Sequence, residues 1–183
     1  MSDPFTIAII TGSPTVPSRS AAVARLAELK LGQGAFRART IQVRDLPASA
    51  LLHAQTDAPE FVSARDLIEK ADGVIVASPV YKASYSGVLK TFLDLLPQFA
   101  LRGKVVLPLL TGGTLAHVLA LDYALRPVLQ SLDARLIVPG LFLLDAWVTK
   151  QDDGSAVLAE DVAPRFDAAV RAFVDGIRCF SEA

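Results

Sequence analysis

Short apolar segments alternate with helical patterns along this chain. Runs of β-branched and small apolar residues that end at Gly, Ser or Pro indicate strands buried on both faces. The predicted strands are Phe5–Thr11, Phe36–Val43, Gly73–Ala77, Val105–Leu110 and Ala134–Leu144. The second alternates apolar and basic residues, as edge strands do, and Pro139-Gly140 interrupts the fifth.

Helical periodicity fills the intervals between these strands. The predicted helices are Ala21–Leu31, Glu60–Lys70, Gly87–Leu96, Leu115–Leu132 and a C-terminal helix carrying Val162, Phe166, Val170, Phe173 and Ile177 on one face. A turn is predicted at Gly32-Gln33-Gly34, and irregular chain at Arg44–Pro59 and Asp145–Ala159. This alternation predicts an α/β fold, a doubly wound parallel sheet of order 2-1-3-4-5 with helices on both faces, forming one domain over residues 1–183.

The helix predicted at Leu115–Leu132 carries two unusual features. Asp122 falls on its apolar stripe, and Arg126 stands four residues further on, where the two side chains can pair. Pro127 cannot donate to the carbonyl of Tyr123 and crowds it. The sequence therefore predicts a kink or π-bulge around Tyr123, which is a common mark of a functional site. The alternative is that the helix simply ends or restarts here.

Polar loops follow three of the predicted strands. The first contains Ser13, Ser18, Arg19 and Ser20 and opens a helix, so its N–H groups, hydroxyls and guanidinium favour a phosphate monoester. The alternative is an ordinary loop in which Ser18 or Ser20 caps the helix. The pattern is neither a Walker nor a dinucleotide-binding glycine motif.

The second loop, Ser78–Gly87, sets two tyrosines among small residues after a buried strand. Tyr81 and Tyr85 offer a flat ligand an apolar surface with a polar edge, although both could equally cover the core. The third loop begins with Thr111-Gly112-Gly113, where small residues expose backbone donors. Because the ends of adjacent parallel strands meet at a switch point, the three loops should converge. That combination suits a phosphorylated flat heterocycle, and FMN is the obvious candidate.

Composition, net charge and cysteine content narrow the class of protein further. The chain has 183 residues, 52% of them hydrophobic, and a formal net charge of −1 with both signs interspersed, so no basic nucleic-acid surface is expected. Cys179 is the one cysteine, which excludes a disulfide framework and a multi-cysteine metal site. The apolar run in the N-terminal segment is too short for a signal peptide or a membrane span, so a cytoplasmic location is expected. His53 and His117 belong to no convincing catalytic constellation.

Three stretches of the chain resemble a known family. They are GSPTVPSRS, ASPVYKASYSGVLKTFLDLLP and GKVVLPLLTGGTLAHVLALDYALRPVL. Over residues 5–145 the sequence is similar to the NAD(P)H-dependent FMN reductases of two-component alkanesulfonate monooxygenase systems. The resemblance implies a flavodoxin-like fold, a homodimer or homotetramer, and reduction of FMN by NADPH or NADH. The reduced flavin would then pass to a partner monooxygenase.

The same resemblance assigns roles to individual residues. It places the phosphate on Ser13, Ser18, Arg19 and Ser20, the isoalloxazine ring against Pro79, Val80, Tyr81 and Ser84, and the pyrimidine edge of the ring on Thr111, Gly112 and Gly113. Tyr123 would stand in a π-helix at the oligomer interface, a feature that separates reductases that release flavin from those that retain it.

The sequence thus predicts an NAD(P)H:FMN oxidoreductase in which hydride passes directly between cofactors and no side chain is catalytic. One alternative is an FMN-retaining reductase of quinones, azo dyes or chromate. Another is a flavodoxin-like electron carrier, which the near-neutral charge disfavours because such carriers are usually strongly acidic. No motif decides between NADH and NADPH.

Overall fold

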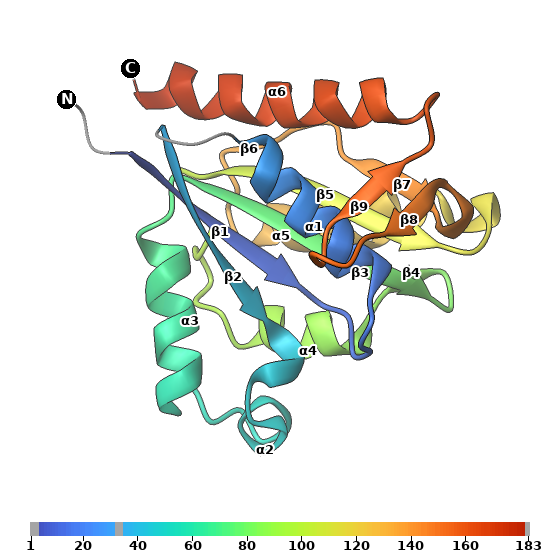
Figure 1. Ribbon diagram of the computed structural model, residues 1–183. Coiled ribbons are helices and arrows are strands. Elements are labelled where there is room, and N and C mark those ends of the chain that lie inside the picture. The colour runs from blue at the N-terminus through green and yellow to red at the C-terminus, as the bar shows by residue number, and fades with distance from the viewer. Residues whose placement is uncertain (1–3, 32–34, 182–183) are drawn as a thin grey trace.

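A mostly parallel sheet forms the centre of the protein, shown by a computed structural model that describes residues 4–31 and 35–181 (Figure 1). Its strands are β1 (Phe5–Thr11), β2 (Phe36–Gln42), β3 (Gly73–Tyr81), β4 (Ser84–Tyr85), β5 (Val105–Gly112), β6 (Leu136–Ile137) and β7 (Leu141–Leu144). The main order is β2-β1-β3-β5-β6, with β7 continuing beside β5. The predicted order is therefore confirmed, and β2 is an edge strand. The predicted turn at Gly32-Gln33-Gly34 lies outside the described residues.

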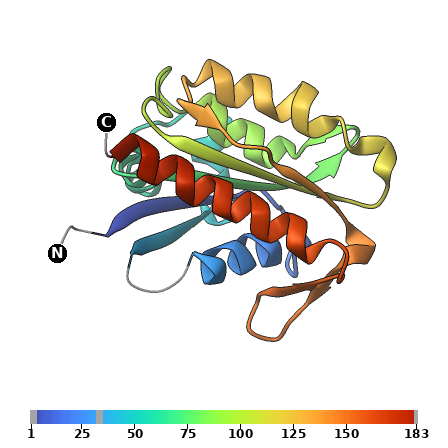
Figure 2. The ribbon, with the colours of Figure 1, turned by 90° about the horizontal axis from the view of Figure 1, so that it is seen from above.

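Helices cover both faces of this sheet, which gives the flavodoxin-like arrangement (Figure 2). One face carries α1 (Arg19–Lys30) and α6 (Ala163–Ser181), and the other carries α3 (Pro59–Glu69), α4 (Gly87–Asp94) and α5 (Arg126–Ser131). Along β1 the side chains alternate between the two layers. Ile7 and Ile9 pack with α1 and α6, whereas Ala8 and Ile10 pack with α3 and α4. No helix among the described residues has the length and apolar character needed to cross a membrane.

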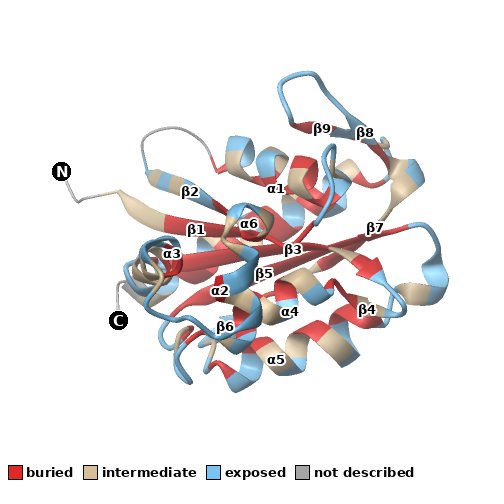
Figure 3. Ribbon diagram, turned by 90° about the horizontal axis from the view of Figure 1, so that it is seen from below, coloured by how far each residue is buried: buried red, intermediate tan, exposed pale blue. Residues whose placement is uncertain are grey.

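Burial on both faces explains why the strands appear in the sequence as continuous apolar runs. All eight residues of β5 are buried, and β1 and β3 are buried along most of their length (Figure 3). The central strands thus lie in a desolvated layer between the helices, and their carboxyl ends form a fixed frame for the loops that follow.

The fifth predicted strand is split into β6 and β7 for a steric reason. β6 pairs with Val105 and Val106, and β7 resumes pairing at Leu109. The gap lies beside Pro108, which has no N–H to donate. Gly140 fits there because it lacks a Cβ, which would meet the Pro108 carbonyl and lie 2.6 Å from Pro108 Cγ. The interruption predicted at Pro139-Gly140 is therefore imposed by the neighbouring strand.

Two segments expected to be irregular contain ordered structure, so those predictions were wrong in part. A 3₁₀ turn (Val43–Asp45) begins at the last residue predicted as strand and enters the first of these segments, which also contains the five-residue helix α2 (Ala48–Leu52). Residues 145–159 include a 3₁₀ turn (Asp145–Trp147) and an antiparallel hairpin of β8 (Val148–Lys150) and β9 (Ala156–Leu158). Elements of three to five residues are too short to produce a recognisable periodicity.

The segment predicted as one helix at Leu115–Leu132 is divided into three. A 3₁₀ turn (Leu115–His117) is followed by a π-helix (Leu121–Leu125) and then by α5. The N–H of Arg126 donates to the Leu121 carbonyl, five residues back, next to the position where Pro127 removes a donor. The predicted bulge around Tyr123 is confirmed, and Arg126 Nε lies 3.0 Å from Asp122 Oδ1 as the spacing indicated.

Candidate functional site

Three strand ends converge on one open cavity, as the sequence predicted. Its volume is about 270 Å³, and its lining residues come from the segments after β1, at the end of β3 and at the end of β5, with one more residue directly after β7. The lining comprises Ser13, Thr15, Pro17, Ser18, Arg19, Ser20, Pro79, Val80, Tyr81, Thr111, Gly112, Gly113 and Asp145. Ten of the eleven predicted binding residues are in this set, and Ser84 is the exception.

The first segment brings donors to the N-terminus of α1. Ser18 caps the helix, since its Oγ accepts from the Ala21 N–H at 3.2 Å, and it also lies 3.1 Å from Ser20 Oγ. The first N–H groups of a helix have no intrahelical partner, and the helix dipole makes that end positive. Ser18 is therefore the helix cap, and it also lines the cavity.

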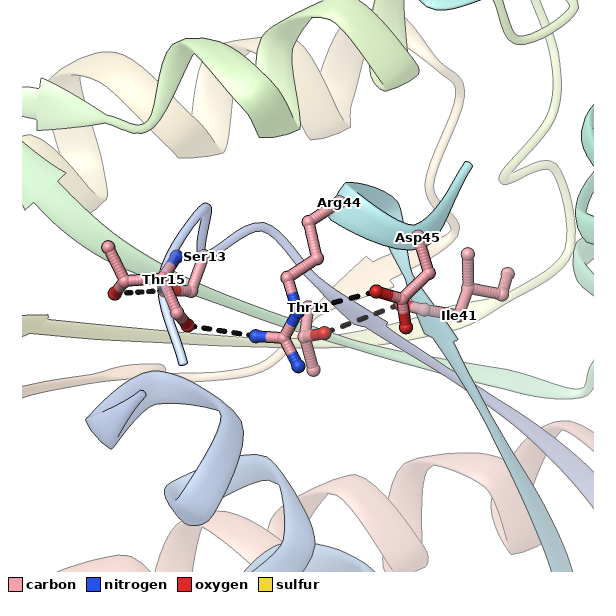
Figure 4. A network of polar contacts seen from close by, with 6 residues as sticks. All are labelled: Thr11, Ser13, Thr15, Ile41, Arg44 and Asp45. Carbon is pink, nitrogen blue, oxygen red and sulfur yellow. Dashed lines mark hydrogen bonds and ion pairs between the residues drawn. The ribbon is translucent and has the colours of Figure 1, made fainter. Parts of the chain in front are cut away.

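A network behind this loop fixes its shape. Arg44, from the turn after β2, donates from Nη1 to the Thr15 carbonyl at 2.9 Å, and its Nε lies 3.5 Å from Asp45 Oδ1 (Figure 4). Within the loop the Thr15 N–H donates to Ser13 Oγ at 3.3 Å. Arg44 thus holds the loop through the Thr15 carbonyl without lining the cavity, whereas Arg19 is one of the lining residues.

The second segment is a hairpin, which corrects the expectation of a loop after Ala77. β3 continues to Tyr81, turns through Lys82 and Ala83, and returns as β4, with Tyr81 opposite Ser84. Lys82 and Ala83 both have positive φ, 51° and 63°, as a type I′ turn requires. Because side chains alternate along a strand, Tyr81 is 47% exposed at the cavity whereas Tyr85 is buried in the core.

Buried serines connect this hairpin to the first loop. The Ser86 N–H donates to Ser78 Oγ at 3.0 Å, and Ser86 Oγ accepts from the Leu89 N–H, capping α4. The Ser86 hydroxyl also donates to the Gly12 carbonyl. A Cβ on Gly12 would lie 2.5 Å from Leu89 Cβ. Close packing and buried hydrogen bonds thus hold the two walls of the cavity in register.

The third segment ends β5 and leaves space at the cavity floor. A Cβ added to Gly113 would have only Asp145 Oδ2 near it, at 4.0 Å, and so would enter the cavity. Asp145 follows β7 directly, and its Oδ2 lies 3.8 Å from Arg19 Nη1. Sequence reasoning missed Asp145, together with Thr15 and Pro17, although a polar residue directly after a strand was the signal that identified Thr111.

These residues fit a phosphorylated flavin. Serine hydroxyls, a helix N-terminus and an arginine belong to the lining, and together they suit a phosphate. Pro79, Val80 and the glycines add small and apolar residues, which suit a flat ring. The half-exposed Tyr81 and Arg19 leave the cavity open at its rim, so a ligand can extend beyond its 270 Å³.

Two larger cavities lie elsewhere and lack this arrangement. One, of about 430 Å³, is mainly apolar and lies between the turn after β2 and α4, on the Arg44 side of the first loop. The other, of about 450 Å³, lies beside Pro97, Phe99 and Lys104. The first is lined by Pro14 and Val43, beyond the ends of β1 and β2, but by no residue of β3 or β5. The second includes Lys104, which precedes β5 and so lies at the amino end of that strand, whereas ligands in this fold bind beyond the carboxyl ends. The smaller cavity is therefore the candidate site.

Burial of Tyr85, in the second strand of the hairpin, leads to a prediction about the pH dependence of stability. Burial raises the pKa of Tyr85 to about 12, and the charge of Asp94 adds to the rise. Because the folded state resists ionisation that the unfolded chain undergoes near pH 10, stability should fall between about pH 10 and pH 12, by up to roughly 2 kcal/mol. In urea unfolding at pH 8, 10 and 11.5, Tyr85→Phe should lose less stability than the wild type. Equal losses would refute the prediction.

Comparison with known proteins agrees with this geometry. A profile of the NADPH-dependent FMN reductase family matches residues 5–149. The chain is 46% identical over 155 residues to an FMN reductase (NADPH) of Pseudomonas putida, covering 85% of this chain and 75% of that protein. It is 49% identical over 139 residues to an FMN reductase (NADPH) of Escherichia coli, covering 76% and 73%. The apo crystal structure of the NADH:FMN oxidoreductase EmoB superposes with a TM-score of 0.84 at 44% identity, covering 92% of this chain and 88% of that one.

The fold and the comparisons together define a flavodoxin-like flavin reductase. The chain belongs to the NADPH-dependent FMN reductase family, and it is an NAD(P)H-dependent oxidoreductase that acts with FMN. These relatives include both NADPH and NADH enzymes.

Proposed function

We propose that the protein reduces FMN as a freely exchanging substrate and supplies the reduced flavin to a partner monooxygenase, which we take to cleave sulfonates. The reduced nicotinamide gives a hydride to the flavin, a proton completes the reduction, and the chemistry is that of the two cofactors. Ser13, Ser18, Arg19 and Ser20 would bind the phosphate. Pro79, Val80, Tyr81 and the segment Thr111–Gly113 would hold the ring, with Ser84 supporting Tyr81 across the hairpin.

One observation carries this proposal: a single open cavity at the carboxyl edge of the sheet brings Ser13, Ser18, Arg19 and Ser20 together with Pro79, Val80 and the glycines at the end of β5. No histidine lines it, and Asp145 is its one carboxylate among the described residues. What the protein contributes is orientation of the flavin and compensation of its phosphate charge. Exposure at Tyr81 and Arg19 favours a ligand that enters and leaves readily.

A second part of the proposal concerns assembly. Apolar side chains are exposed around the π-helix, including Leu115, Leu119 and Tyr123, whose exposed fractions are 54%, 58% and 79%. Exposed apolar clusters of this kind often mark contacts between proteins. We propose that a second copy of the chain covers this surface in a homodimer or homotetramer. Tyr123 would then lie at the contact that affects flavin release.

Purified protein should be colourless and oxidise NADPH or NADH only when FMN is added, with a rate that saturates in FMN. Absorbance at 340 nm measures the turnover, and light scattering on the same sample measures the subunit number. A yellow preparation that ignores added FMN but reduces a quinone would identify an FMN-retaining reductase instead. A preparation that binds FMN but oxidises neither nicotinamide would identify an electron carrier.

A further inference from the structure

Asp145 places a carboxylate in a cavity that the proposed function fills with an anion. The residue follows β7, whose last residue, Leu144, pairs with Gly112 at the end of β5. Its Oδ2 lies 3.8 Å from Arg19 Nη1 on one side and 4.0 Å from the Cβ position of Gly113 on the other. One oxygen thus lies near Arg19, which the proposed function assigns to the phosphate, and near Gly113, which it assigns to the ring.

The charges of the cavity explain why a carboxylate at this position affects the binding of an anion. Among the described lining residues, Arg19 is the one cation and Asp145 the one carboxylate, so their formal charges cancel. A phosphate monoester brings about −1.5 to −2 charges at pH 7. It must therefore displace the carboxylate from Arg19 and then remain a few ångströms from it, and both effects oppose binding.

The pair itself is loose. A separation of 3.8 Å is longer than a charge-assisted hydrogen bond, and the side chains of Arg19 and Asp145 are 45% and 39% exposed. Exposed ion pairs of this kind contribute little to stability. A strong phosphate contact can therefore replace this one, but the negative charge of Asp145 stays beside the site after the exchange.

This inference rests on the proposed function. We propose that Asp145 weakens the binding of phosphorylated flavin in two ways: it holds Arg19 before FMN binds, and it repels the phosphate afterwards. The residue thereby sets how readily FMN leaves the site. Its effect is specific to the phosphate, because riboflavin, which has the same ring and ribityl chain, carries no charge for Asp145 to oppose.

The test is a comparison of FMN and riboflavin binding to wild type and Asp145→Asn, measured by quenching of flavin fluorescence. Asparagine keeps the size of the side chain and removes its charge. Asp145→Asn should lower the Kd of FMN about three- to tenfold and leave the Kd of riboflavin unchanged. This increase in FMN affinity should become smaller as the salt concentration is raised from about 20 mM to about 500 mM, because salt screens interactions between exposed charges.

Asp133→Asn is the matched control. Asp133 also pairs with an arginine, since its Oδ2 lies 2.6 Å from Arg102 Nε, but it does not line the cavity. Its φ is 66°, a conformation that asparagine tolerates well. This variant removes the same overall charge, so an equal change in FMN affinity would show that only net charge acts, and would overturn the proposal.

The remaining outcomes are separable. Weaker binding of both flavins by Asp145→Asn would mean that Asp145 is a flavin ligand, and an unchanged Kd of FMN would mean that it has no role in affinity. Either result overturns the inference and leaves the proposed function intact. If wild type binds riboflavin as tightly as FMN, the phosphate site itself is wrong, and the inference fails with it.

Discussion

Replacing Arg19 by methionine should raise the Kd of FMN about 30-fold, equivalent to about 2 kcal/mol, the usual contribution of a hydrogen bond to a charged group. Arg19 lines the cavity beside Ser18 and the N-terminus of α1, where a phosphate is stabilised by several donors at once. Methionine keeps most of the side-chain length and removes the charge and every donor. The Kd of riboflavin should change less than about threefold, because the missing interaction is with the phosphate.

Fluorescence titration of both flavins checks this expectation, with Arg19→Lys as the matched variant. Lysine restores the charge but not the planar fork of donors, so it should recover only part of the affinity. Thermal stability should stay close to that of wild type in both variants, because the 3.8 Å contact with Asp145 is the ion pair that Arg19 makes. Equal losses for FMN and riboflavin would show that Arg19 does not bind the phosphate.

Much of the fold follows from patterns that repeat along the sequence. Apolar runs such as Phe5–Thr11 and Val105–Leu110 identified the buried strands, because a strand covered on both faces has no polar side to break the run. Their alternation with helices gave the sheet order, which the structure confirms. Because the carboxyl ends of adjacent parallel strands meet at a switch point, three loops could then be predicted to meet at one cavity. Pro127 identified the π-helix, since a missing N–H is visible in the sequence.

What the sequence did not reveal depends on geometry without a local signature. The turn at Lys82 and Ala83 has positive φ at both residues yet contains no glycine or asparagine, so the hairpin looked like a loop. Asp145 faces Arg19 only because the last strand ends beside Gly112, and nothing in the spacing of the two residues indicates that contact. The Arg44 contact with the Thr15 carbonyl is equally non-local.

The break in the last strand also supports the second large prediction. Gly140→Ala should lower the free energy of unfolding by about 3 kcal/mol, the cost of overpacking a rigid core. The new methyl group would meet the Pro108 carbonyl and lie 2.6 Å from Pro108 Cγ and 3.1 Å from Leu121 Cδ1. Neither the proline ring nor its carbonyl can move aside, because β5 is buried along its whole length and pairs with β3.

Urea and thermal unfolding would measure this cost, with an expected fall in Tm of about 6–12 °C for a chain of this size. Gly87→Ala is the control, because a Cβ at the first residue of α4 would meet no atom within 4 Å. That variant should be unchanged or slightly more stable, since alanine favours a helix over glycine. If Gly140→Ala unfolds like wild type, Pro108 does not force the gap between β6 and β7. The same methyl group would also crowd Leu121, which is the first residue of the π-helix. A Gly140→Ala protein that still folds should therefore show its structural change in the π-helix.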